Sequence, residues 1–222
     1  MDWSIIIAIT ADISILLPFF VLLLRKAVIK DIHLMMALYI LLTFLRNLLS
    51  TFIEITRKTK HLDLNTVFLY NIHNIIGFWI ISYLYFRLLN GKFWRYFVIF
   101  SNIIFLSFAL YDFETLSDWN TARFNDYSYP IAGFFIIILL LQFFYQLLKK
   151  LEVPRLSDFP LFWFSAGALI YYSGTFFMYL VIHTVNTNHH LGRLYWPIDA
   201  ILSITFHVLV AIAVWKIRPN RV

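Results

Sequence analysis

Long apolar runs alternate with short polar stretches along the whole chain. A bilayer core of about 30 Å needs about 20 helical residues, because each residue of an α-helix adds about 1.5 Å. The runs of suitable length cover approximately residues 3–24, 33–53, 66–89, 96–112, 127–148, 160–184 and 194–216. This pattern predicts an all-α polytopic membrane protein. We expect a single bundle of seven transmembrane helices, forming one domain over residues 1–222 with no soluble domain.

Polar side chains recur at helical spacing within four of these runs. Residues three or four positions apart share one face of a helix, so each set forms a stripe. The stripes contain Tyr39, Thr43, Arg46, Asn47 and Ser50; Tyr70, His73, Asn74 and Gly77; Tyr172, Thr175, Tyr179 and His183; and Asp199, Ser203 and His207. Lipid cannot hydrogen-bond such groups, so the stripes must face one another or water. We therefore expect a polar interior between the helices.

The stretch "LYILLTFLRNLLSTFI", residues 38–53, places Arg46 inside an otherwise apolar helix. A charge at this depth calls for an opposite charge or a water-filled cavity. Asp12 and Asp199 are the acids in the expected helix interiors that can neutralise it. Asp12 is the first choice because its helix directly precedes that of Arg46. A structural alternative stays open, in which the ion pair only fixes helix packing or Arg46 extends to the outer interface.

The composition agrees with a membrane protein, since 61% of the residues are hydrophobic and 14% are charged. The mean hydropathy is +0.77. The net charge of +6 would also suit a nucleic-acid partner. In a membrane protein, however, the position of the basic residues carries more information than their sum. We expect contact with the lipid bilayer and no nucleic-acid partner.

The basic residues are divided unequally between the two ends of the expected bundle. One end carries Arg25, Lys26, Lys30, Arg87, Lys92, Arg95, Lys149, Lys150, Arg155, Lys216, Arg218 and Arg221, and the other carries Arg57, Lys58, Lys60, Arg123 and Arg193. The positive-inside rule therefore places the N-terminus outside and the C-terminus in the cytoplasm. The first run lacks a basic n-region and a small-residue cleavage site, so we expect a retained helix. The expected location is the cytoplasmic (inner) or plasma membrane.

The polar stripes define a candidate site near the outer half of the bundle. Its expected ligand-binding residues are Asp12, Arg46, His73, Asn74, Tyr172, His183 and Asp199. Sites between helices with a few convergent polar groups are a common form of small-molecule pocket. The first interpretation is therefore a membrane sensor or binding protein with an outward-facing polar cavity for a small ligand and no favoured cofactor. Because the expected cytoplasmic loops are short, the signal would pass to a separate partner protein.

In helix number and orientation, this topology is similar to microbial rhodopsins and to seven-helix receptors generally. The last helix, "LYWPIDAILSITFHVLVAIAVWKI", has its lysine, Lys216, at the cytoplasmic end. A retinal Schiff base needs a buried lysine, so we do not expect retinal.

Two other functions stay open. Seven-helix hydrolases such as the alkaline ceramidases and adiponectin receptors hold zinc with three histidines, and His73, His183 and His207 supply that number. An intramembrane zinc hydrolase acting on lipid is therefore the first alternative, although no two of these histidines are four positions apart. A proton-coupled transporter is the second, because proton relays use acids and histidines such as Asp12, Asp199, His73 and His207. Cysteine is absent, which excludes disulfides and thiolate chemistry.

Overall fold

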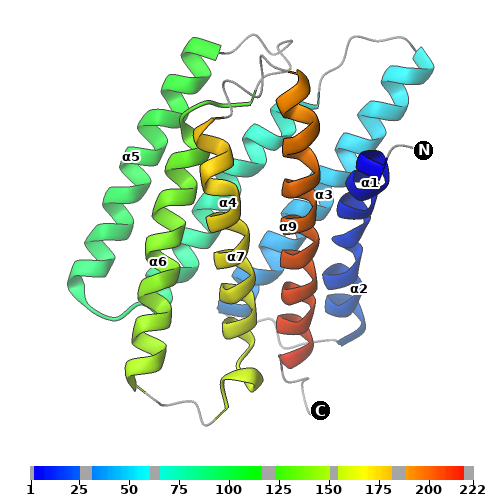
Figure 1. Ribbon diagram of the computed structural model, residues 1–222. Coiled ribbons are helices and arrows are strands. Elements are labelled where there is room, and N and C mark those ends of the chain that lie inside the picture. The colour runs from blue at the N-terminus through cyan, green and yellow to red at the C-terminus, as the bar shows by residue number, and fades with distance from the viewer. Residues whose placement is uncertain are drawn as a thin grey trace.

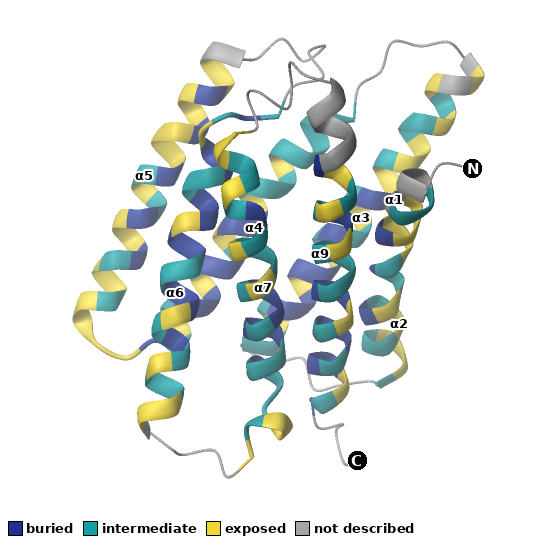
Figure 2. Cartoon of the chain, viewed as in Figure 1, coloured by how far each residue is buried: buried dark blue, intermediate teal, exposed yellow. Residues whose placement is uncertain are grey.

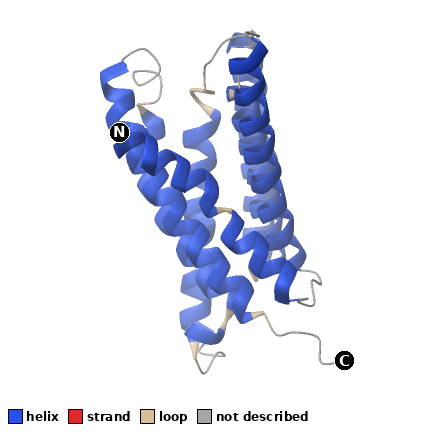
Figure 3. Cartoon of the chain, turned by 90° about the vertical axis from the view of Figure 1, so that its right-hand side faces the viewer, coloured by secondary structure: helices blue, strands red, loops and turns tan. Residues whose placement is uncertain are grey.

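The computed structural model describes residues 3–25, 32–60, 66–116, 124–150, 155–181 and 189–217. All regular structure within these ranges is helical (Figure 3), which confirms the all-α prediction. The elements are α1 (Trp3–Ser14), α2 (Leu16–Arg25), α3 (Ile32–Lys60), α4 (Val67–Leu88), α5 (Lys92–Leu116), α6 (Ser128–Lys150), the short 3₁₀ helix η1 (Leu156–Asp158), α7 (Pro160–Leu180) and α9 (His189–Lys216).

Six of the described helices are long and apolar enough to cross a membrane. These spans are Ile32–Arg57, Val67–Leu88, Lys92–Glu114, Ser128–Lys149, Pro160–Leu180 and Tyr195–Lys216. Large apolar side chains cover their outward faces, and exposed positions continue along α5 and α6 (Figure 2). Phe177, for example, is 71% exposed. An apolar outer surface of this kind is suited to lipid, so the chain is an integral membrane protein in contact with the bilayer.

The first expected helix, residues 3–24, is divided at Ile15 into α1 and α2. Pro18 explains the division, because proline has no N–H to donate to the carbonyl four residues earlier. The helical hydrogen bonds resume when the N–H of Phe19 donates to the carbonyl of Ile15 at 3.3 Å. With 12 and 10 residues, α1 and α2 are each too short to cross a bilayer alone. Together they run along the bundle between its two ends (Figure 1).

The helices form a ring in which α9 has neighbours on two sides. It packs against α7 on one side and against both α1 and α2 on the other. The ring continues from α2 through α3, α4 and α6 back to α7, while α5 packs outside it against α4 and α6 (Figure 1). The Trp3 end of α1 and the Lys216 end of α9 lie at opposite ends of the bundle (Figure 1). The ring encloses the polar stripes of α3, α4, α7 and α9.

Aromatic and hydrogen-bonded contacts hold the centre of the bundle together. The fully buried Tyr85 of α4 shares a 2.7 Å hydrogen bond with the hydroxyl of Ser165 on α7. Phe78 of α4 stacks on Phe105 of α5 with a ring-centroid distance of 4.1 Å. Pairs of this kind combine apolar packing with a directional contact, so they set the register of neighbouring helices.

Charged contacts join three elements at the Lys216 end of the bundle. Lys216 donates to a carboxylate oxygen of Asp158 in η1 at 2.9 Å. This hydrogen bond and the positive charge of Lys216 hold the pKa of Asp158 below its usual value. On the other side of α9, the guanidinium carbon of Arg25 lies 4.0 Å from the ring centroid of Trp215. The C-terminal ends of α2 and α9 are thereby connected.

Asp112 is a fully buried acid near the end of α5, and its charge is matched by the start of α6. Its carboxylate accepts the N–H of Ser128 at 2.7 Å and the N–H of Tyr127 at 3.3 Å. The first N–H groups of a helix have no partner within that helix, and a negative charge there interacts favourably with the helix dipole. Asp112 therefore caps α6 from a neighbouring helix.

Replacing Asp112 with alanine should lower the free energy of unfolding by about 1–2 kcal/mol, because α6 loses its cap. Asp112→Asn should have a smaller effect, since an amide oxygen still accepts a hydrogen bond. The exposed Glu114, two positions away, provides the control, and Glu114→Gln should change stability by less than about 0.5 kcal/mol. Equal stability of Asp112→Ala and wild type in thermal unfolding in detergent would contradict the capping role.

The α7–α9 contact depends on a glycine. A Cβ added at Gly167 would lie 2.9 Å from Cδ2 of Phe206 and 3.0 Å from Cβ of Leu209, whereas one added at Gly133 would lie 3.5 Å from Cδ2 of Phe176. We expect Gly167→Ala to destabilise the bundle by about 1–3 kcal/mol through overpacking. Gly133→Ala should be neutral or stabilising by up to about 1 kcal/mol, because alanine favours helix. Thermal unfolding of both variants tests this, and a reversed order would refute it.

Candidate functional site

A cavity of about 350 Å³ lies between α1, α3, α4, α6, α7 and α9, and we call it the polar cavity. It is lined by Ala11, Asp12, Tyr39, Thr43, Arg46, Thr66, Val67, Tyr70, His73, Phe124, Tyr129, Tyr171, Tyr179, Trp196, Asp199, Ala200, Ser203, Phe206 and His207. It reaches Thr66, which directly precedes α4, and Phe124, which lies four positions before the start of α6. Those starts lie at the same end of the bundle as Trp3 (Figure 1).

Arg46 projects from α3 into the polar cavity. Its guanidinium carbon lies 4.4 Å from the ring centroid of Tyr70 on α4, within the range of a cation–π contact. Its Nε atom is buried and has no hydrogen-bond partner. In the part of the chain that the structure describes, no carboxylate oxygen lies within 4.0 Å of the guanidinium nitrogens. The aromatic ring of Tyr70 therefore compensates part of the charge.

The structure does not pair Asp12 with Arg46 as the sequence suggested. Both Asp12 and Asp199 line the polar cavity with Arg46, and both interact with it electrostatically, but neither forms an ion pair within 4.0 Å. The contact between α1 and α3 is made instead by Asn47, whose Nδ2 donates to the main-chain carbonyl of Asp12 at 3.1 Å. Oδ1 of Asp199 is buried without a hydrogen-bond partner. The three charges thus share one cavity without direct contact.

The two histidines of the polar cavity each bond to a hydroxyl. Nε2 of His73 lies 3.0 Å from the hydroxyl oxygen of Thr43, and Nδ1 of His207 lies 2.6 Å from that of Ser14. The Thr43 hydroxyl also donates to the main-chain carbonyl of Tyr39, and the Ser14 hydroxyl donates to that of Ala11. A hydroxyl has one hydrogen to donate, so this network assigns the histidine nitrogen as the donor in both pairs. A neutral His73 then keeps Nδ1, and a neutral His207 keeps Nε2, as an acceptor.

The other expected site residues lie in different places. Asn74 and Tyr172 line a smaller pocket of about 40 Å³ that shares His73 and several tyrosines with the polar cavity. Nδ2 of Asn74 is buried there without a hydrogen-bond partner. His183 falls outside the described residues. The structure therefore brings Asp12, Arg46, His73 and Asp199 into one cavity and places Asn74 and Tyr172 beside it.

Several aromatic residues of the cavity wall were not expected. They are Phe124, Tyr129, Tyr171, Trp196 and Phe206. In a chain that is 20% aromatic, such side chains ordinarily fill the core or anchor the membrane interface. Tyr171, four positions before Thr175, and Trp196, three before Asp199, had a sequence signal, because each shares a helix face with a polar stripe. His207 lay in the α9 stripe but was expected only as a possible metal ligand or as part of a proton relay.

A zinc site needs three or more protein ligands close together. Within the described ranges, no group of three or more His, Asp or Glu side chains could hold a metal ion. His73 and His207 share the cavity wall, whereas the third expected ligand, His183, is not described.

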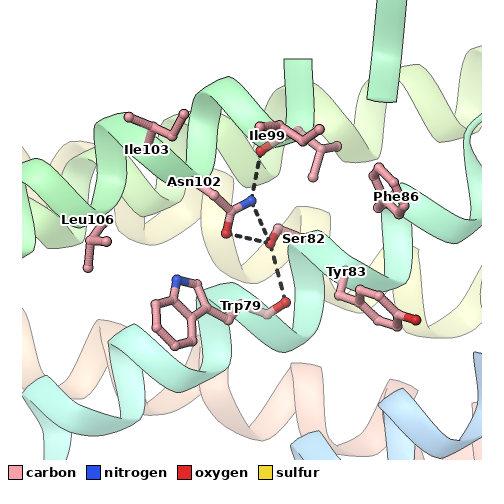
Figure 4. Close-up of a pocket in the computed structure, with 9 residues that line it drawn as sticks. Trp79, Ser82, Tyr83, Phe86, Ile99, Asn102, Ile103 and Leu106 are labelled. Carbon is pink, nitrogen blue, oxygen red and sulfur yellow. Dashed lines mark hydrogen bonds between the residues drawn. The ribbon is translucent and has the colours of Figure 1, made fainter. Parts of the chain in front are cut away.

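A second hollow, of about 490 Å³, lies between α4 and α5 (Figure 4). Its wall is mostly apolar and includes Trp79, Phe86 and Ile103. Its polar groups satisfy each other, since Nδ2 of Asn102 donates to the hydroxyl of Ser82 at 3.1 Å and to the carbonyl of Val98 at 2.7 Å (Figure 4). This groove is suited to apolar contact and carries no unpaired charge, so the polar cavity is the better candidate site.

The fold and the site together define an integral membrane helical bundle with an internal cavity that contains charged and aromatic side chains. Comparisons of the chain with models of protein families, with curated proteins and with solved structures found no match. The chemistry of the cavity is therefore the basis for assigning a function.

The unpaired state of Arg46 leads to a prediction about stability. Removing one partner of a buried ion pair typically costs about 3–5 kcal/mol, whereas removing an unpaired charge relieves a desolvation cost. We therefore expect Arg46→Met to leave the ligand-free protein as stable as wild type, or more stable by about 1–3 kcal/mol. Arg57→Met is the control, because Arg57 is an exposed residue of the same helix paired with Glu54 at 2.9 Å, and its loss should cost less than about 1 kcal/mol.

Denaturant or thermal unfolding of the two variants in one detergent gives the comparison. A loss of several kcal/mol in Arg46→Met, with the fold of Arg57→Met intact, would show that Arg46 acts as a structural ion-pair partner.

Proposed function

We propose that the protein is a seven-pass membrane binding protein that takes up a small polar ligand from the outer side of the membrane. The observation that carries this proposal is that Arg46, Asp12 and Asp199 share one cavity and form no ion pair with one another. Charges inside a membrane protein are costly and by default mark functional sites. Arg46 lies over the Tyr70 ring, but its Nε and the Oδ1 atom of Asp199 have no hydrogen-bond partner, so a ligand is the partner that would use these groups.

The orientation follows from the basic residues. The seventh pass is formed by α1 and α2 together, which places the two termini on opposite sides. The end of the bundle with Arg25, Arg87, Lys149 and Lys216 would be cytoplasmic by the positive-inside rule, in a plasma or bacterial inner membrane. The polar cavity reaches toward the other end, so it would receive its ligand from outside. Occupancy would be signalled to a separate partner protein.

Proton-coupled transport is a second candidate, and one observation favours it. His73, His207 and Asp199 lie on the wall of the same cavity, and both histidines are hydrogen-bonded to hydroxyl groups. Acids and histidines that share an intramembrane cavity are the usual elements of a proton relay. Ligand uptake into proteoliposomes that depends on a proton gradient would favour this candidate over a binding protein.

A native mass spectrum of the protein, released from gently solubilised membranes, tests the binding function. We expect a retained small molecule on wild type and on Arg57→Met but not on Arg46→Met, because Arg46 lines the polar cavity and Arg57 does not. A bare chain in all three samples would count against a binding site. A molecule retained equally by all three would place the site elsewhere.

A further inference from the structure

We propose that the ligand of the polar cavity is a small zwitterion with an apolar body, of the amino-acid class. Its carboxylate would bind Arg46, its ammonium would bind Asp199, and its apolar part would lie on the aromatic wall. This inference rests on the proposed binding function and adds the chemical class of the ligand.

The first argument is the separation of unlike charges. Oδ1 of Asp199 is buried and has no hydrogen-bond partner. Nε of Arg46 is also buried without a hydrogen-bond partner. The two groups line one cavity, with no ion pair between them. A molecule carrying both charges can place each opposite its counterpart, and carboxylate–guanidinium hydrogen bonds are among the strongest available. A singly charged ligand would satisfy one group and leave the other unpaired.

The second argument is the balance of charge around the cavity. One cation, Arg46, faces two carboxylates, Asp12 and Asp199. A lone anion would meet this excess of negative charge, and a lone cation would meet the guanidinium. A zwitterion can place its carboxylate at the guanidinium and its ammonium at a carboxylate, so it suits the site better than either ion. The acceptor nitrogens of neutral His73 and His207 can also receive N–H groups.

The third argument is the aromatic wall, which we define as Phe124, Tyr129, Tyr179 and Trp196. Their rings are in mutual contact, with centroid distances of 5.2 Å for Phe124–Trp196, 6.0 Å for Phe124–Tyr129 and 4.7 Å for Tyr129–Tyr179. All four residues line the polar cavity. Trp196 precedes Asp199 by three positions on α9, so both share one face of that helix. Connected rings of this kind bind an apolar body and also attract a nearby ammonium.

The size of the cavity limits the ligand. Its volume of about 350 Å³ is near the lower end of the roughly 300–1,000 Å³ that small-molecule pockets occupy. A molecule of the size of a single amino acid fits this volume, whereas a whole phospholipid does not.

Isothermal titration calorimetry in lipid nanodiscs tests the proposal with three matched probes. L-Phenylalanine carries both charges, phenylpropionate lacks the ammonium, and phenylethylamine lacks the carboxylate. We expect wild type to bind L-phenylalanine at least about tenfold more tightly than either analogue, since each lost charge-assisted contact costs about this factor or more.

Two variants test which side chain binds each charged group of the ligand. In Arg46→Met, L-phenylalanine should bind no better than phenylethylamine, and in Asp199→Asn no better than phenylpropionate. Arg57→Met should retain the preference of wild type. Thermal unfolding of each variant checks its fold, and if Asp199→Asn does not fold, the three probes on wild type and Arg46→Met still decide.

The outcomes separate this inference from the proposed function. If phenylpropionate or phenylethylamine binds as tightly as L-phenylalanine, and Arg46→Met abolishes that binding, the cavity binds ligands but the zwitterion class is wrong. If no probe binds while the native mass spectrum shows a retained molecule, the inference is again overturned and the binding function stands. If no probe binds and the native spectrum shows bare chains, both fail.

Discussion

The cost of holding the Arg46 charge between membrane helices is the constraint on which the rest of this structure depends. Lipid offers the guanidinium no hydrogen bonds, so the charge needs a polar space that is closed off from the acyl chains. The polar cavity provides that space, and six helices supply its wall. The α3, α4, α7 and α9 stripes face inward because each of their polar groups is subject to the same constraint.

The position of α9 follows from this requirement. It contacts α7 on one side and the α1–α2 pair on the other, so it closes the ring around the cavity. Its contact with α7 is close because Gly167 leaves room for Phe206. Its contact with α1 includes the hydrogen bond between His207 and Ser14, the last residue before the division near Pro18. Close packing on one side and polar contact on the other are the two ways in which membrane helices associate without a hydrophobic driving force.

The sequence predicted the helices well because the length and polarity of a membrane span are dictated by the bilayer. It also predicted that the polar stripes of Arg46, His73 and Asp199 would meet, since periodicity reports which residues share a face. It did not predict that Arg46 would lie over Tyr70 while Asn47 made the contact with Asp12. Adjacent residues differ by about 100° around a helix, and which of the two faces the cavity depends on helix rotation in the bundle.

The aromatic part of the wall was beyond sequence reasoning for a related reason. Phe124 precedes α6 and Tyr129 lies in its first turn, and the packing of α6 beside α7 brings the ring centroids of Tyr129 and Tyr179 to 4.7 Å. Aromatic side chains are common throughout this protein, so composition could not separate those of the site from those that face lipid. The division of the first helix was more accessible, because Pro18 by itself interrupts the hydrogen-bond pattern.

Two buried acids of this protein show how a structural carboxylate differs from a functional candidate. Asp112 has its charge matched by two main-chain N–H groups at the start of α6, so it contributes to the fold and has little capacity left for a ligand. Asp199 has a buried oxygen without a partner, on the wall of a cavity that also contains an unpaired cation. The sequence shows an aspartate at the end of one apolar run and another inside a second run, but it does not show whether their hydrogen bonds are satisfied. The satisfaction of their hydrogen bonds, and not burial alone, distinguishes the acid that holds helices together from the acid that is available to bind.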